Sequence, residues 1–237
     1  MHDLAEQQPG KLKEMIDLWY REARTYNVLP LQGTIGQRTT FPRPMPGRAT
    51  DKHVYFPGAP VGALVAPNTY NRPHTITAEV HVPEGGAEGV IYALGSNAGG
   101  YALFVKEGKL NFVYNCEGHK RYRIASDKKL PTGDITIQYG FEVTGDPDFK
   151  NGSGAPGTGI LAVNGEKVGS VDMDKTTPFI FCIEGLSVGY DYGDTVDHES
   201  YRDAFPFTGT ITKVTYDVSG DAIHDAEADA RRLLGRQ

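Results

Sequence analysis

From Thr75 onward, apolar and polar residues alternate along the chain with a period of two. The alternation covers 75–82 and is most regular over 135–143, where Ile, Tyr, Phe and Val occupy every second position. Successive side chains of a β-strand point to opposite faces of a sheet, so this pattern predicts strands with one buried face. Similar segments recur as far as residue 218 with few helical patterns between them. Such spacing is typical of an antiparallel sandwich or barrel.

Two dipeptides that contain glycine mark tight turns between predicted strands. Glu107-Gly108 separates one pair of alternating segments, and Asn164-Gly165 separates another. Glycine adopts the positive φ that a two-residue hairpin turn requires, so both dipeptides predict β-hairpins. The chain has 29 glycines and 15 prolines among 237 residues. This proportion favours many turns and short strands over a helical bundle.

Residues 9–27 carry a helical pattern instead of an alternating one. Apolar side chains recur every three or four positions, which places them on one face of a helix. Pro9 suits the first turn of this helix, and Pro30 cannot continue it. The apolar face is too extensive to stand alone in water, so we predict that it contacts a partner. Its central residues are Leu12, Met15, Ile16 and Trp19.

These patterns divide the chain into four parts. Residues 1–30 contain the N-terminal helix, and 31–73 are expected to form an irregular wrapping linker because prolines interrupt any long element. The β-sandwich is expected over 74–220. The final segment, 221–237, is amphipathic, with Asp221 near its start and two arginines near its end, and predicts a short C-terminal helix.

The charge of the chain excludes some classes of partner. Its 24 Lys and Arg against 30 Asp and Glu give a net charge of −6, so no basic excess exists to neutralise the phosphates of a nucleic acid. No apolar run approaches the roughly 20 residues that span a membrane. The N-terminal segment lacks the apolar region of a secretory signal, so a cytoplasmic protein is expected.

Cys116 and Cys182 fit no zinc spacing, and two free thiols are expected, with one disulfide as the alternative.

Several segments together resemble one protein family. They are KLKEMIDLWYREARTYNVLPL (11–31), VYFPGAPVG (54–62), the long segment 71–115, RYRIASDKKLP (121–131) and FPFTGTITKVTYDV (205–218). These segments are similar to the C-terminal region of bacterial arylsulfatases of the alkaline-phosphatase-like superfamily. The resemblance implies an all-β fold, a two-sheet antiparallel sandwich of the concanavalin A-like or jelly-roll type, preceded by a helix and linker from a catalytic domain.

The resemblance does not imply sulfatase activity for this chain. Sulfatases require a Cys or Ser in a C/S-x-P-x-R motif, which becomes the formylglycine nucleophile, and acidic residues that hold a divalent cation. Cys116 is followed by Glu-Gly-His-Lys, and Cys182 by Ile-Glu-Gly-Leu. We therefore predict no catalytic residue and no cofactor. The expected function is that of an accessory module that packs on a sulfatase-type catalytic domain or subunit, or self-associates; the alternative is a free-standing carbohydrate-binding, lectin-like module.

The turn-like segment 190–199 gathers acidic side chains. Asp191, Asp194 and Asp197 recur at intervals of three, and carboxylates on a loop are ligands that Ca²⁺ prefers. The segment lacks the D-x-[DN]-x-[DN]-G pattern of a calcium loop. The pattern therefore favours a solvated rim loop over a calcium site.

The most basic segment is 119–123. Arg121 and Arg123 alternate with apolar residues and so share one strand face, and His119 precedes them. Guanidinium groups bind carboxylates and other anions through paired hydrogen bonds. We expect an ion pair with a partner domain; a sulfated ligand and plain solvation are the alternatives.

The chain is rich in aromatic residues, with 13 Tyr and 10 Phe. Exposed rings stack on sugars in binding modules, but the alternating positions of Tyr101, Phe112 and Tyr139 predict core packing. A lectin-like module should expose two or three rings on a concave sheet face. A glycoside hydrolase would need two positioned carboxylates, and the E-x-D-x-x-E signature does not occur.

Overall fold

The computed structural model describes residues 4–26, 28, 51–63, 65–178 and 184–223. Among these residues, no helix is both long enough and apolar enough to cross a membrane.

The chain divides into two compact units, 1–45 with 233–237 and 46–232. The first unit contains helix α1 (Pro9–Thr25), which begins with a proline in its first turn as the sequence predicts. The helix expected over 221–237 lies almost entirely outside the described residues.

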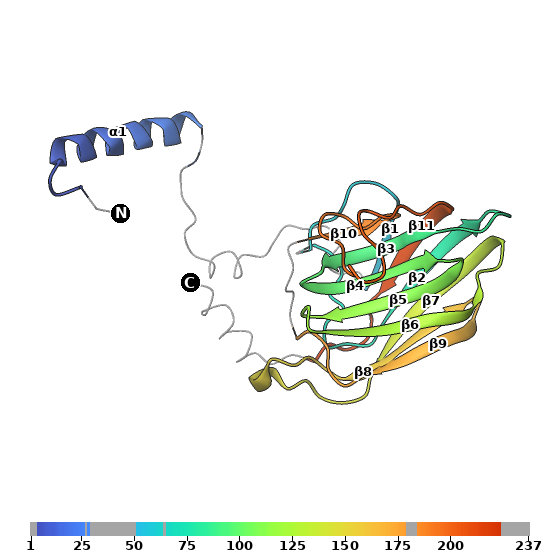
Figure 1. Cartoon of the computed structure of the whole chain (residues 1–237). Helices are drawn as coiled ribbons and strands as arrows, with labels where there is room; N and C mark the ends of the chain where they lie inside the picture. The colour runs from blue at the N-terminus through green and yellow to red at the C-terminus, as the bar shows by residue number, and fades with distance from the viewer. Residues whose placement is uncertain (1–3, 27, 29–50, 64, 179–183, 224–237) are drawn as a thin grey trace. The chain divides into compact units, whose positions relative to one another are not determined.

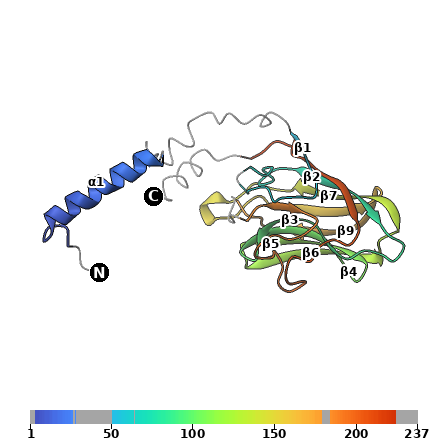
Figure 2. The same cartoon turned by 90° about the horizontal axis from the view of Figure 1, so that it is seen from above.

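The second unit contains two antiparallel sheets, which Figures 1 and 2 show as stacked layers. One sheet has six strands in the order β1-β11-β2-β7-β8-β9, and the other has five in the order β10-β3-β4-β5-β6. The strands are β1 (Lys52–Tyr55), β2 (His74–Val82), β3 (Gly89–Ser96), β4 (Gly99–Lys106), β5 (Lys109–Cys116), β6 (Lys120–Lys129), β7 (Gly133–Val143), β8 (Gly157–Val163), β9 (Glu166–Met173), β10 (Leu186–Val188) and β11 (Thr210–Asp217); a short 3-10 helix, η1 (Phe149–Asn151), precedes β8.

The predicted fold class is confirmed, because the described chain is an all-β sandwich of two antiparallel sheets with an N-terminal helix. The strand β1 lies within 31–73, the range predicted to be an irregular linker. It pairs with β11 at the edge of the six-stranded sheet. A four-residue strand at an edge gives too short an alternation to distinguish it from coil in the sequence.

Both predicted hairpins form. Glu107 and Gly108 have φ values of 55° and 73° between β4 and β5, and Asn164 and Gly165 have φ values of 50° and 81° between β8 and β9. Positive φ at both central residues is the geometry that suits the right-handed twist of the flanking strands.

The main core lies between the two sheets and is rich in aromatic rings. Phe112 from β5 stacks on Tyr139 from β7, with ring centroids 3.8 Å apart and planes at 16°. Tyr101 from β4 lies 6.3 Å from the same Phe112 ring. Phe112 and Tyr139 are both almost completely buried. The prediction that these alternating aromatics pack in the core is therefore confirmed.

A second, smaller cluster covers the outer face of the five-stranded sheet. Residues 189–207, here named the covering loop, place Val196, Tyr201 and Phe205 over Phe104 and Val113. The Tyr201 ring meets the Phe104 ring edge-on, with centroids 4.9 Å apart. Because the loop buries this face, the five-stranded sheet offers little outer surface for a ligand over β3, β4 and β5.

Cys116 is a buried free thiol, and burial raises its pKa. Cys182 lies outside the described residues.

Candidate functional site

The three aspartates singled out in the sequence lie on the covering loop, where the chain itself supplies their partners. Asp191 is buried and accepts hydrogen bonds from Val196 N at 2.9 Å and from the Tyr201 hydroxyl at 2.6 Å. Asp194 pairs with His198 at 2.7 Å. Among the described residues, no group of three His, Cys, Asp or Glu side chains is placed to hold a metal ion.

Asp197 joins the covering loop to β6. Its carboxylate is fully buried and lies 2.7 Å from Arg123 Nη2 and 3.3 Å from Arg121 Nε. Glu199 contacts the same two guanidinium groups, at 2.9 Å from Arg123 and 3.7 Å from Arg121. His119 is exposed in the turn before β6. The two arginines thus pair with acidic residues of their own chain, an arrangement that none of the sequence interpretations included.

The Asp191 carboxyl makes the covering loop sensitive to pH. Burial raises its pKa from the ordinary 3.8 to about 6. The folded protein therefore binds the Asp191 proton more tightly than the unfolded chain does. The protonated carboxyl contributes roughly 3 kcal/mol to the free energy of unfolding. This contribution is complete below pH ~3.8 and is lost as the pH rises through ~6.

The substitution Asp191→Asn is expected to remove this dependence. Val196 N and Tyr201 Oη donate to the same oxygen of Asp191, so an amide oxygen can accept both bonds. Urea unfolding across this pH range should show that the variant loses less stability than the native protein as the pH rises. An unchanged pH profile in the variant would contradict the assignment to Asp191.

The predicted contact face of α1 is exposed. Leu12, Met15, Ile16 and Trp19 each leave between 42% and 59% of their surface accessible. Trp19 packs edge-on against Tyr20 of the same helix. The contact of this face with a partner stays a prediction.

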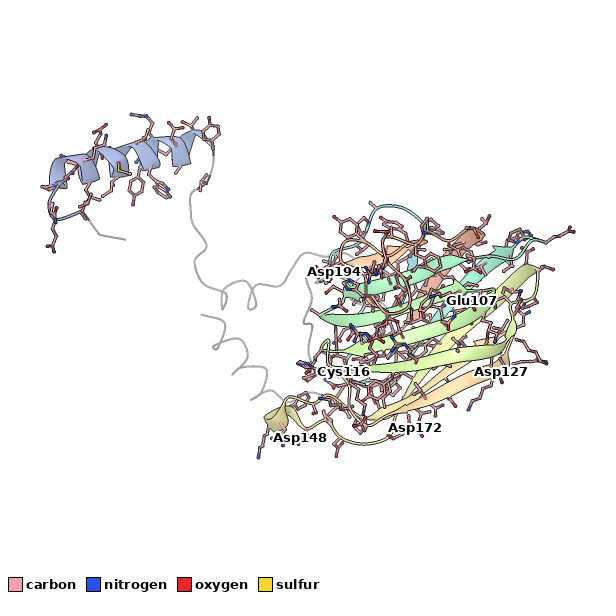
Figure 3. The ribbon with its side chains drawn as sticks, in the orientation of Figure 1. Glu107, Cys116, Asp127, Asp148, Asp172 and Asp194 are labelled. Carbon is pink, nitrogen blue, oxygen red and sulfur yellow. The ribbon has the colours of Figure 1, made fainter. Side chains whose placement is uncertain are left out.

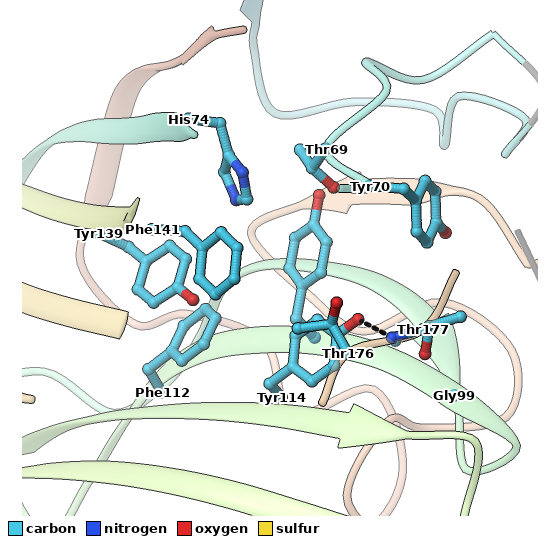
Figure 4. A pocket seen from close by; sticks show the side chains of 12 residues that line it. Thr69, Tyr70, His74, Gly99, Phe112, Tyr114, Tyr139, Phe141, Thr176 and Thr177 are labelled. Carbon is cyan, nitrogen blue, oxygen red and sulfur yellow. Dashed lines mark hydrogen bonds between the residues drawn. The ribbon is translucent and has the colours of Figure 1, made fainter. Parts of the chain in front are cut away.

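An aromatic pocket lies between the sheets where β2 begins and β5 ends (Figure 4). The Tyr114 hydroxyl accepts a hydrogen bond from Thr177 N at 2.9 Å, and the His74 ring lies 5.4 Å from the Phe141 ring. Burial lowers the pKa of His74 to about 4, so this ring is neutral at ordinary pH. The free space is about 20 Å³, which holds about one water molecule. The rings therefore fill this pocket and leave no room for a ligand.

The outer face of the six-stranded sheet contains a larger hollow, here named the Gly140 groove. Its free volume is about 480 Å³, within the roughly 300–1,000 Å³ of small-molecule sites. In the sheet register Gly140 of β7 stands between Thr75 of β2 and Ile160 of β8. A Cβ atom placed on Gly140 would meet nothing within 4 Å. The groove therefore exists because this position carries no side chain.

Polar side chains surround the floor of the Gly140 groove. Gln138 and Glu142 flank Gly140 on β7, and Asp217 lies opposite Thr75 on β11. The side chains of Thr75, Gln138 and Glu142 make no hydrogen bond with the described residues. Asp217 lies 3.1 Å from Lys52, and hydrogen bonds from Ser219 and Lys52 lower the pKa of Asp217. The groove thus offers a hydroxyl, an amide and two carboxylates on rigid strands.

The Gly140 groove was not predicted from the sequence. One signal was present, because Gly140 interrupts the most regular alternation of the chain on its polar side. Glycine inside a strand weakens it and often marks a place where another molecule approaches the backbone. The neighbours that enclose the hollow come from three further strands, and their register is not visible in the sequence.

Comparisons with known proteins bear on the predicted family. No family model matches the chain, and no curated protein matches it. A carbohydrate-binding module, described as the Ruminococcus gnavus IT-sialidase CBM40 bound to α2,3-sialyllactose, has 17% identity and a TM-score of 0.46 over 76% of this chain and 96% of that chain. Domains LG4-5 of the mouse laminin α1 chain have 17% identity and a TM-score of 0.46 over 73% of this chain and 42% of that chain. The similarity to both structures concerns the sandwich fold.

These comparisons contradict the arylsulfatase resemblance. The similar structures are a sialidase carbohydrate-binding module and laminin domains, and none of those reported is a sulfatase domain. The resemblance rested on short segments spread along the chain, in which strand alternation and turn residues recur in many unrelated sandwiches. The predicted role as an accessory module packed on a sulfatase catalytic domain is accordingly wrong.

Proposed function

We propose that this chain is a non-catalytic carbohydrate-binding module and that the Gly140 groove is its binding site. The observation that carries the proposal is a ligand-sized hollow over Gly140, with three hydrogen-bonding side chains at its rim, Thr75, Gln138 and Glu142, that have no partner among the described residues. Concave sites of this kind bind small molecules through a few convergent polar groups.

The chemistry of the rim suits a neutral saccharide. Each sugar hydroxyl both donates and accepts hydrogen bonds, and the Gly140 groove offers acceptors in Glu142 and Asp217 and both kinds of group in Gln138 and Thr75. The floor of Gly140, Ile160 and Ala162 can receive the C–H face of a sugar ring. The two carboxylates would repel an acidic ligand at this position.

Asp217 of the Gly140 groove does not have the character of a glycosidase proton donor. A glycosidase uses one carboxyl of raised pKa as a proton donor beside a second carboxylate. The pKa of Asp217 is lowered, and the carboxyl whose pKa is raised, Asp191, is buried beneath the covering loop. These facts support binding without catalysis.

The aromatic platform expected of a lectin-like module is not the basis of this proposal. Among the described strands, no Tyr, Phe or Trp ring stands exposed on an outer sheet face. Recognition in the Gly140 groove would therefore depend on hydrogen bonds and shape more than on ring stacking, and weak, millimolar affinity is expected, about −4 kcal/mol.

The substitution Gly140→Val tests the proposal by filling the groove. Gly140 has no positive φ and its Cβ position is open, and a β-branched residue suits a strand, so stability should be unchanged or rise by up to ~1 kcal/mol. A glycan array of neutral saccharides identifies a ligand, and calorimetry should then show at least an approximately tenfold loss of affinity in the variant.

Thr136→Val is the matched control, because Thr136 lies on the same strand and the same outer face but outside the groove. This variant should bind like the native protein. The proposal fails if the native chain binds no neutral saccharide on the array, or if Gly140→Val binds as tightly as Thr136→Val.

A further inference from the structure

A second groove lies at one end of the sandwich, where the end of β6 meets the β8–β9 hairpin. Figure 3 places Asp127 of this region at the opposite end of the strands from Cys116. Its free volume is about 440 Å³. We name it the lysine groove, after the three cationic side chains that line it. These are Lys128, Lys129 and Lys167, and two carboxylates, Asp127 and Glu166, line it as well.

A bulge in β6 brings two of the lysines to the groove. Between the pairs Asn111–Ala125 and Lys109–Lys129, one residue of β5 faces three residues of β6. Bulges of this kind redirect side chains and recur beside functional sites. Ser126 holds the bulge in place, because its hydroxyl donates to Lys128 O at 2.7 Å and accepts from Leu110 N at 3.0 Å.

The third lysine comes from the other sheet. β6 and β9 run alongside each other at the edges of the two sheets, and the approach is so close that a Cβ atom on Gly169 would lie 2.5 Å from Ile124. This contact holds Lys167 of β9 across the groove from the β6 bulge. The Lys129 stem packs over Gly108 in the neighbouring turn, 3.1 Å from a Cβ position there. The three lysine side chains are thus attached to rigid strands, which fix where their ammonium groups can reach.

The charged groups of the lysine groove are unused within the described chain. The three ammonium groups and the two carboxylates form no ion pair and no hydrogen bond with a described residue. Lysines elsewhere on the sandwich do form ion pairs; Lys213, for example, lies 3.0 Å from Glu79. Three positive charges against two negative charges leave this groove cationic on a chain whose net charge is −6. A cationic groove on an acidic protein attracts anions.

We propose that the lysine groove is a second binding site, specific for acidic saccharides, and that it acts independently of the Gly140 groove. Ammonium groups donate to the carboxylate or sulfate groups of such a ligand. Asp127 and Glu166 accept hydrogen bonds from its hydroxyls. The groove walls also include Leu130, Pro131 and Val168, which give a sugar ring apolar surface.

The mixture of charges favours this class of ligand over other anions. A ligand whose anionic groups are not accompanied by hydroxyls would meet only repulsion from Asp127 and Glu166, because both carboxylates line the same hollow. An acidic saccharide spaces its charges with hydroxyl groups, so it can satisfy the ammonium groups and the carboxylates together. An acidic peptide offers no comparable row of hydroxyls.

Titration with two four-unit probes tests the proposal. Tetragalacturonate carries one carboxylate on each sugar, and its full methyl ester has the same hydroxyls without the charge. Calorimetry of the full chain should show binding of tetragalacturonate and at least an approximately tenfold weaker binding of the ester. The triple substitution of Lys128, Lys129 and Lys167 by Gln should lower the affinity for tetragalacturonate about tenfold, and added salt should lower it in the native protein.

A matched triple variant replaces Lys13, Lys150 and Lys175 by Gln and so removes the same charge outside the groove. It should bind tetragalacturonate like the native protein. The proposal is overturned if both triple variants weaken binding equally, if the ester binds as well as the acid, if a tetraglutamate peptide binds more tightly than the saccharide, or if neither tetragalacturonate nor a heparin tetrasaccharide binds. Gly140→Val should leave this binding unchanged, so failure at one groove is distinguishable from failure at the other.

Discussion

Replacing Asp197 with alanine is expected to lower the free energy of unfolding by about 3 kcal/mol. The Asp197 carboxylate has no exposed surface, and it contacts Arg123 at 2.7 Å and Arg121 at 3.3 Å. Only 14% of the Arg121 side chain is exposed. Removal of the carboxylate leaves this guanidinium group poorly compensated in a region of little solvent, which is costly.

Urea unfolding measures the expected loss, and Glu199→Ala is its control. Glu199 contacts the same two arginines, but 66% of its side chain is exposed. Water screens an exposed pair, so this variant should lose less than about 1 kcal/mol. Amide hydrogen exchange of Val196 and Tyr201 should quicken in Asp197→Ala because the covering loop is then held less firmly. Equal losses in the two variants would show that Asp197 does not fasten the loop.

Phe112→Ala is expected to have the largest effect on stability, about 3–5 kcal/mol. Phe112 is 1% exposed, and its ring stacks on Tyr139 at 3.8 Å between centroids. The two residues belong to different sheets, so their contact is part of what holds the sandwich together. The truncation removes apolar surface from the core and leaves a cavity in the aromatic pocket, because Phe112 is one of the rings that fill it.

The conservative variant Phe112→Leu separates the loss of volume from the loss of the ring. Leucine retains most of the buried volume, so the change of shape should lower the free energy of unfolding by less than about 1.5 kcal/mol. The lost ring stacking should lower it by a further contribution of roughly 0.5–1.5 kcal/mol. The denaturant midpoints of both variants, with m-values like that of the native protein, give the comparison. A cost for Phe112→Ala no larger than that for Phe112→Leu would contradict a central place for this ring in the core.

Local patterns identified most of the strands because each strand buries one face. The alternation over 135–143 requires no knowledge of other strands, since every second side chain must leave the water. The Asn164-Gly165 turn is equally local, because its backbone needs positive φ at two successive residues. The edge strand β1 has only four residues. Only two of them can face the core, so the alternation of apolar and polar residues is too short to recognise in the sequence.

The candidate residues show where local patterns fail. Asp191, Asp197 and Arg121 were singled out for their charge, and the structure uses all three to fasten the covering loop. Arg121 and its partner Asp197 come from segments far apart in the chain, β6 and the covering loop. Charge along a sequence indicates that a side chain needs a partner, but the tertiary fold decides whether that partner is solvent, a ligand or another part of the same chain.

The sequence by itself determined the all-β class, the hairpins and the identity of the core rings, because these depend on neighbours within a few residues. Tertiary structure alone decided the two grooves. The hollow at Gly140 needs four strands in register around a missing side chain, and the lysine groove needs a bulge in β6 beside the edge of β9. Open space between side chains is a property of distant segments packed together, and no single segment encodes it.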